Sequence, residues 1–209
     1  MGSKGKLPLI LASASPRRRE LLRLASIPLE VIPSRAKERF LKGESPADHV
    51  RRVARAKAME VAGQHPGRWV LAADTVVEID GKMLGKPKDR REAEEMLRSL
   101  SQRVHGVLTG YCILRCPSGE KREGTVISRV KFKALTAAEI RWYIKTGEPF
   151  DKAGGYAIQG KAAFMVQEVH GSYTNVVGLP VCEVVEALRE LGAVDLFLPQ
   201  STRRSQRKE

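Results

Sequence analysis

Near the start of the chain, one stretch predicts the centre of the fold: Leu9-Ile-Leu-Ala-Ser-Ala-Ser-Pro-Arg-Arg-Arg-Glu-Leu-Leu22. Its first four residues form an apolar run of a length typical of a buried strand. Ser15 is a favourable N-cap and Pro16 suits the first helical position, so a helix is expected to begin there. The strand therefore leads directly into a helix N-terminus, where unpaired backbone N–H groups favour an anion.

This junction indicates a phosphate-binding loop, because hydroxyl and guanidinium groups gather at it. They belong to Ser13, Ser15, Arg17, Arg18 and Arg19. The stretch is not a Walker loop, since no Gly-Lys-Ser/Thr sequence follows. Taken alone, an ordinary strand-to-helix turn with a solvated basic helix explains the same residues equally well.

The composition indicates a single globular domain. The chain has 209 residues, of which 42% are hydrophobic and 29% charged, enough for a core under a polar surface. It contains neither an apolar run long enough to span a bilayer nor a signal-peptide pattern, so no membrane segment is expected. Three cysteines (Cys112, Cys116 and Cys182) are a sparse, odd set, which predicts free thiols and a reducing, cytoplasmic location.

The formal net charge of +13 points to an acidic partner without identifying it. A strongly basic protein can bind nucleic acid or small phosphorylated substrates. Nucleic-acid binding favours aromatic side chains among the basic ones. Aromatic residues make up only 5% of the chain, and the arginine-rich stretches hold few of them.

Alternating strands and helices predict an α/β fold with a mixed sheet. Beyond the first strand and helix, we expect strands at 29–33, 69–73, 76–79, 105–114, 121–132, 156–159 and 164–166. Helices are expected from Ser45 to about Gly63, from 90 to 100, from 137 to about 146 and from 180 to 191. Asp89 with Glu92 and Thr136 with Glu139 have the spacing of capping boxes. Residues 171–175 are expected to form a loop.

Asp74 and Thr75 stand between two apolar runs, at the expected end of a central strand. Ligands commonly bind beyond the carboxyl ends of such strands, which makes Asp74 a candidate catalytic carboxylate. The alternative is a turn-forming acid before the hairpin that Asp80-Gly81 predicts.

Two lysines are further candidates. Lys57 lies on the apolar face of its helix, where it either extends to solvent or points into a cleft. Lys86, between Gly85 and Pro87, would by itself be assigned to the surface. Together with the first loop, Asp74-Thr75 and the segment from Asp151-Lys152 to Gln159, Lys86 would supply the anion-binding groups and the carboxylate that hydrolysis of a phosphoanhydride requires.

Six segments, in this order and spacing, closely resemble the Maf family of nucleoside triphosphate pyrophosphatases. They are Ser13-Ala-Ser-Pro-Arg-Arg18, Ala73-Asp-Thr-Val-Val77, Gly85-Lys-Pro87, Asp151-Lys-Ala-Gly154, Ile158-Gln-Gly160 and Asn175-Val-Val-Gly-Leu-Pro180. The resemblance covers roughly residues 7–191. It implies a mixed central sheet flanked by helices, with a deep cleft between two lobes. It also implies a divalent metal, Mg or Mn, and conversion of a nucleoside triphosphate to the monophosphate and pyrophosphate.

The resemblance implies a role for each candidate. Asp74 matches the proton acceptor, and it is implied with Glu38 as a metal ligand; the sequence leaves open whether Asp74 is base or ligand. The phosphate loop is matched by Ser13, Arg17 and Arg18, and the two cleft lysines by Lys57 and Lys86. Positions associated with base selection in the dTTP/UTP branch are matched by Arg17, Thr75 and Gln159. Arg35 and Lys37 occupy sites where family members often carry acids.

By itself, Gln159 would be assigned as a strand residue satisfied by its neighbours. Its amide offers a donor and an acceptor, which suits the edge of uracil or thymine. The glycine beside it, Gly160, would let the backbone approach a planar ring.

These observations predict a leader at 1–6, a single Maf-like catalytic domain at 7–198 and a basic, disordered tail at 199–209. The expected partner is a nucleoside triphosphate, with a homodimer implied by the family. The competing interpretation is a non-catalytic nucleic-acid-binding or cell-division regulatory protein. A duplex binder would lose affinity with salt at a log–log slope of about −0.9 per phosphate contact.

Overall fold

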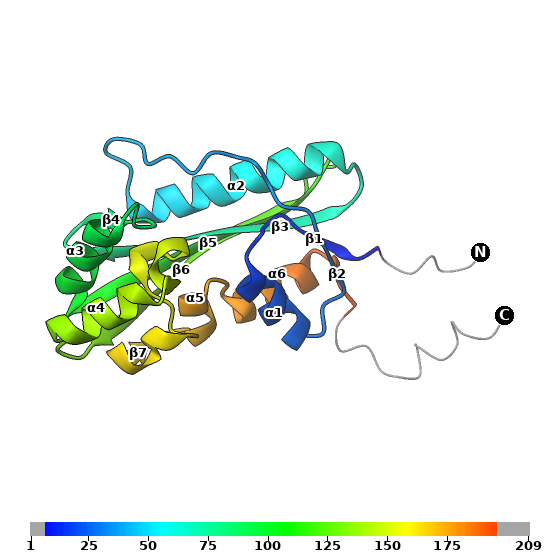
Figure 1. Ribbon diagram of the computed structural model, residues 1–209. Helices are drawn as coiled ribbons and strands as arrows, with labels where there is room; N and C mark the ends of the chain where they lie inside the picture. Colours follow the sequence, from blue (N-terminus) through cyan, green and yellow to red (C-terminus); the bar gives the residue numbers. More distant parts are fainter. Residues whose placement is uncertain (1–6, 196–209) are drawn as a thin grey trace, which may run out of the picture.

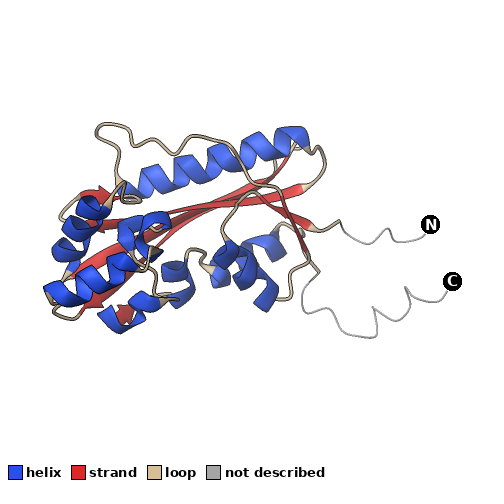
Figure 2. Ribbon diagram, in the orientation of Figure 1, coloured by secondary structure: helices blue, strands red, loops and turns tan. Residues whose placement is uncertain are grey.

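The computed structural model describes residues 7–195, so the predicted leader at 1–6 and tail at 199–209 lie outside the described residues. The described chain folds around one mixed sheet, in which β2, β1 and β3 are parallel and the other pairs antiparallel. Its order is β2 (Leu29–Val31), β1 (Leu9–Leu11), β3 (Trp69–Ile79), β5 (Val104–Arg115), β6 (Lys121–Phe132) and β7 (Val166–His170), with β4 (Lys82–Leu84) also on β3. The predicted mixed α/β fold is confirmed (Figure 2).

Helices cover both faces of the sheet (Figure 1). The long helix α2 (Pro46–Gln64) packs on one face, against β3 and β5. The opposite face is covered by α1 (Pro16–Leu24), α3 (Arg90–Leu100), α4 (Ala137–Lys145), α5 (Tyr173–Val177) and α6 (Val181–Glu190). Within residues 7–195, no helix is long and apolar enough to cross a membrane.

The predicted helix starts are confirmed by their caps. Ser15 and Ser45 accept hydrogen bonds from the backbone N–H groups three residues on, and Thr136 forms the reciprocal capping box with Glu139. Asp89 caps α3, but Glu92 accepts from the N–H of Lys88, so the reciprocal bond expected there is not formed. Helix α2 continues through Gly63 and ends at Gln64.

The predicted break at Asp74 and Thr75 is wrong. Residues 69–79 form one strand, in which these two residues pair with Gly110 and Thr109 of β5. Pairing with β5 runs from Trp69 to Glu78, so two polar residues do not interrupt it. Asp74 therefore lies in the middle of β3 instead of at its end.

The prediction for residues 156–175 is also wrong in part. Residues 156–159 form no strand, and Lys161–Met165 is a 3₁₀ helix that precedes β7. Their apolar side chains, such as Tyr156 and Met165, are buried in the core without strand pairing. In apolar runs this short, periodicity cannot distinguish a strand from a helix. The expected loop at 171–175 contains the start of α5, capped by Ser172.

Strand β3 lacks a neighbouring strand along part of one edge. Its pairing with β1 ends at Leu71, where the carbonyl accepts from Ala12 N at 2.8 Å, and its pairing with β4 begins at Val77. Residues 72–76 thus have no strand partner on this side in the described chain. Buried backbone groups there need other partners. This opening in the sheet positions the site.

On the face of the sheet that α2 covers, the close approach of α2 to β5 depends on Gly110. A Cβ at this position would lie 2.4 Å from the carbonyl carbon of Val50 in α2, a backbone atom that cannot rotate away. Replacement by Ala must therefore displace the helix from the sheet.

We expect Gly110→Ala to lower the free energy of unfolding by about 3 kcal/mol, as overpacking of a core does. Gly63→Ala is the matched control: it lies in α2 with open space where the added methyl would stand, and should raise the same quantity by about 0.5–1 kcal/mol. Urea unfolding of both variants measures the difference. Equal effects would contradict a backbone contact at Gly110.

Candidate active site

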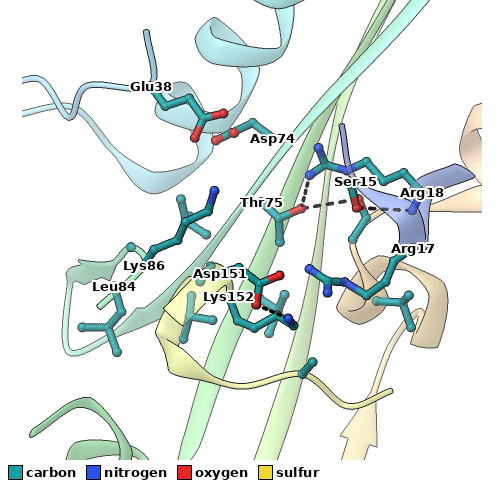
Figure 3. A pocket seen from close by; sticks show the side chains of 18 of the residues that line it. Ser15, Arg17, Arg18, Glu38, Asp74, Thr75, Leu84, Lys86, Asp151 and Lys152 are labelled. Atoms are coloured by element: carbon teal, nitrogen blue, oxygen red, sulfur yellow. Dashed lines mark hydrogen bonds and ion pairs between the residues drawn. The ribbon is translucent and has the colours of Figure 1, made fainter. Parts of the chain in front are cut away.

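A cavity of about 740 Å³ opens at the unpaired edge of β3. Its walls come from the loop between β1 and α1, the middle of β3, the loop after β4 and the segment 151–159 (Figure 3). All the site residues expected from the sequence line it, namely Ser13, Arg17, Arg18, Glu38, Lys57, Asp74, Thr75, Lys86 and Gln159. Residues spread over more than 140 positions of sequence therefore share one cavity.

The alternation of side chains along β3 gives this cavity two chemically different sides. Asp74 points to the face covered by α2, together with Val70 and Ala72. Thr75 points to the opposite face, toward Arg18 and the turn at Gly178. Asp74 and Thr75, although adjacent in sequence, therefore contact two different groups of residues.

On the α2 side, Lys57 joins two carboxylates. Its Nζ lies 2.8 Å from Oδ1 of Asp74 and 2.5 Å from Oε1 of Glu38. Lys57 and Asp74 are buried, whereas about half of the Glu38 side chain is exposed. The position of a lysine on an apolar helix face is explained, because its ammonium reaches into the cavity.

The charges around Glu38 favour its ionised form. Partial burial by itself raises the pKa of Glu38, but the charge and hydrogen bond of Lys57 and the charge of Lys86 outweigh it and hold the pKa below its usual value. Lys86 is exposed on the loop after β4 and points toward Glu38 and Asp74 (Figure 3).

On the opposite side, Arg18 is a buried clamp. Its guanidinium donates to the carbonyl oxygens of Gly178 and Ala73, both at 2.8 Å, and to the hydroxyls of Ser13 at 3.2 Å and Thr75 at 3.0 Å. Burial lowers its pKa. The carbonyl of Ala73 lies on the unpaired edge of β3, so Arg18 supplies a donor where no strand does. A role of Arg18 in binding substrate stays a prediction.

The side chain of Arg17, in contrast, makes no hydrogen bond or ion pair with any residue from 7 to 195. It points into the cavity toward Asp151, which is paired with Lys152 (Figure 3). Partial burial raises the pKa of Asp151, but its hydrogen bond to Lys152 and the positive charges of Lys152 and Arg17 lower it overall. This side of the cavity thus presents a guanidinium that is not bound by any residue of the described chain.

Lys152 also lines the cavity, as does His49, which the sequence did not suggest as a site residue. Lys152 belongs to one of the six family-like segments, but its direction could not be derived from spacing. His49 is buried, with Nε2 3.6 Å from Oδ2 of Asp74. A signal existed for His49: it precedes Lys57 by two helical turns and therefore shares its face of α2.

Gln159 is exposed in the cavity wall, in a turn and not in a strand. A Cβ on Gly160 would lie 2.4 Å from Oε1 of Glu148, so this glycine makes room for an internal carboxylate. The same carboxylate accepts from Lys161 N at 3.1 Å. The expected approach of a planar ring to the backbone at Gly160 stays a prediction.

The sequence comparisons agree with the cavity residues. The family model "Maf-like protein" matches residues 8–191. The chain belongs to the Maf family. A relative from Geotalea uraniireducens (strain Rf4), named dTTP/UTP pyrophosphatase, is 53% identical over 92% of this chain and 99% of its own. Another with that name, from Syntrophus aciditrophicus (strain SB), is 49% identical over 94% of this chain and 96% of its own.

The solved structure of the Staphylococcus aureus Ham1 protein aligns with this Maf chain at 14% sequence identity and a TM-score of 0.48. The alignment covers 88% of this chain and 98% of that one.

The two adjacent arginines of this Maf protein should respond very differently to replacement by lysine. Arg18→Lys removes a planar fork that serves four acceptors, which one ammonium cannot reach together, and should lower the free energy of unfolding by about 3 kcal/mol. Arg17→Lys should change it by less than about 0.5 kcal/mol. Denaturant unfolding measures both. An unchanged free energy of unfolding in Arg18→Lys would show that the guanidinium network does not stabilise the edge of β3.

Proposed function

We propose that this protein hydrolyses the α–β phosphoanhydride of a nucleoside triphosphate, releasing the monophosphate and pyrophosphate. The observation that carries the proposal is a buried carboxylate, Asp74, held beside Lys57 in a cavity whose walls present further cations, Arg17, Lys86 and Lys152. Such a cavity suits a small polyanion that must be attacked by water. The names of the half-identical relatives favour the same reaction.

In the proposed reaction, a water oxygen forms a bond to the α-phosphorus while the bond to the bridging oxygen of pyrophosphate breaks. Asp74 accepts the proton of that water, and Lys57 fixes the orientation of its carboxylate through Oδ1. Arg17 and Lys86 bind phosphate oxygens and offset the charge that accumulates on the leaving pyrophosphate.

A divalent cation, Mg or Mn, is part of the proposal. Residues 7–195 contain no cluster of three or more His, Cys, Asp or Glu side chains suited to a metal. Mg²⁺ is commonly bound by one or two carboxylates together with substrate phosphates, and Asp74 and Glu38 provide such a pair of carboxylates at one ammonium. When bound, the metal would neutralise phosphate charge and make water more acidic.

Asp74→Asn tests the catalytic carboxylate. We expect turnover of dTTP and UTP to fall by about two to four decades, as loss of a general base or metal ligand does. Glu78→Gln is the matched control, because it removes a carboxylate from the same strand outside the cavity lining. Pyrophosphate release with Mg or Mn, together with the melting temperature, measures the effect. Near-normal turnover in a folded Asp74→Asn protein would overturn the assignment.

Gln159 is proposed to select the base, with Arg17 and Thr75. A site that hydrogen-bonds a base edge discriminates strongly, because a wrong base leaves polar groups unpaired. We expect dTTP and UTP to be preferred over purine triphosphates, and Gln159→Ala to reduce that preference more than it slows the best substrate. Gln167→Ala, an exposed glutamine on β7, is the control. The measurement is kcat/KM for dTTP, UTP, CTP, GTP and 7-methyl-GTP. An unchanged ranking would contradict this role.

Nucleic-acid binding, the alternative function, can be distinguished from hydrolysis with the same purified protein. A pocketed hydrolase should show nucleotide-selective, metal-dependent turnover, whereas a duplex binder should lose affinity steeply with salt. The homodimer stays a prediction, which light scattering in solution tests.

A further inference from the structure

His49 lies between Asp74, the proposed catalytic carboxylate, and the ion pair of Glu44 with Arg52, which does not line the cavity. The His49 side chain is 2% exposed. Its Nδ1 lies 3.1 Å from Oε2 of Glu44, and its Nε2 lies 3.6 Å from Oδ2 of Asp74. The other oxygen of Asp74 is the one that contacts Lys57. Each carboxylate oxygen of Asp74 therefore has its own cationic or polar neighbour on α2.

Glu44 is held in place by Arg52. Arg52 donates from Nε to Oε1 at 2.5 Å and from Nη2 to Oε2 at 2.8 Å, and Nη2 also donates to the carbonyl of Arg39. The hydrogen bond from Arg52, against the effect of burial, lowers the pKa of Glu44 to about 2. Nδ1 of His49 faces both this carboxylate, at 3.1 Å, and Nη2 of Arg52, at 3.3 Å. The proton is assigned to Nδ1 because the contact with Glu44 is the shorter one and an ionised carboxylate only accepts.

The orientation of the imidazole is thereby determined. Nδ1 donates to Glu44, and the ring of Phe40 packs against it with centroids 4.5 Å apart. The Nε2 edge can then only face Asp74. At 3.6 Å this contact is too long for a direct hydrogen bond, and it is a packing contact between the buried ring and Oδ2.

We propose that His49 and Glu44 are positioning residues, which set the orientation of the Asp74 carboxylate for its reaction with substrate. The inference rests on the proposed function of Asp74. Groups in this outer layer of a site commonly change activity by about 10–100-fold when they are removed. Because they act through Asp74, they should affect kcat and leave KM almost unchanged.

Helix α2 carries a second ion pair of the same kind, which provides a control. Arg55 contacts both carboxylate oxygens of Glu123, and the Glu123 side chain is 12% exposed, compared with 10% for Glu44. Glu123 does not line the cavity and faces Cys112 instead of a histidine. Glu44→Gln and Glu123→Gln thus remove equivalent charges with different connections to the site.

We expect Glu44→Gln and His49→Gln to lower kcat for dTTP by about 10–100-fold with KM changed by less than about threefold. Glu123→Gln should leave both constants within about twofold, at a similar loss of melting temperature. In an Asp74→Asn background, His49→Gln should lower the residual kcat no further, because the group that it positions is already lost. Equal kcat values for Glu44→Gln and Glu123→Gln, or an undiminished effect of His49→Gln without Asp74, would overturn the proposal.

A measurement independent of turnover separates this inference from the proposed reaction. In ¹H–¹⁵N NMR spectra, His49 should show a slowly exchanging Nδ1–H proton that is lost in Glu44→Gln and kept in Glu123→Gln. A crystal structure of His49→Gln should show a rotated Asp74 carboxylate. An unrotated carboxylate or a missing Nδ1–H signal would overturn the positioning role. If both structural results hold while no triphosphate is hydrolysed, the proposed reaction fails and the geometric part of the inference stands.

Discussion

The hydrogen bond from Arg18 to the carbonyl of Ala73 makes the rest of the site possible. A strand in the middle of a sheet normally has both edges paired, and an unpaired buried carbonyl is costly. Here β1 ends before the middle of β3 and β4 begins after it, so residues 72–76 have no strand partner on this edge, and Asp74, Thr75 and Val76 among them line the cavity. Arg18 supplies the missing donor at 2.8 Å. The sheet can therefore open toward a ligand without leaving this carbonyl unpaired.

The same opening decides which side chains meet. Because residues alternate along β3, a ligand at this edge faces the carboxylate of Asp74 on one side and the hydroxyl of Thr75 on the other. The two sides differ in how firmly their charged side chains are held by protein partners. Around Thr75, the guanidinium of Arg18 is occupied by protein acceptors, which makes this side a rigid wall. Around Asp74, the charges are balanced among side chains that can exchange partners, such as Glu38 and Lys86.

The sequence predicted the composition of the site better than its geometry. Local signals were sufficient for the caps at Ser15, Ser45 and Thr136, because each depends on contacts within four residues. They were insufficient at Asp74, where pairing with β5 keeps the strand continuous across two polar residues. The role of Gly160 could not be predicted either, since it depends on Glu148, which is distant in sequence and close in space. Single lysines such as Lys57 became interpretable only in combination with motifs far along the chain.

The contacts of Lys57 show how burial, more than distance, determines which partner holds a charge. Its contact with Glu38, at 2.5 Å, is shorter than the one with Asp74, at 2.8 Å, and on distance alone the two energies would differ by about a tenth. Glu38 is about half exposed, whereas the Asp74 side chain is 9% exposed. An effective dielectric constant of about 20 near Asp74, against a value approaching about 80 in water, strengthens the buried contact by up to about fourfold. Lys57 is therefore held chiefly by Asp74, and its contact with Glu38 is the weaker and more exposed of the two.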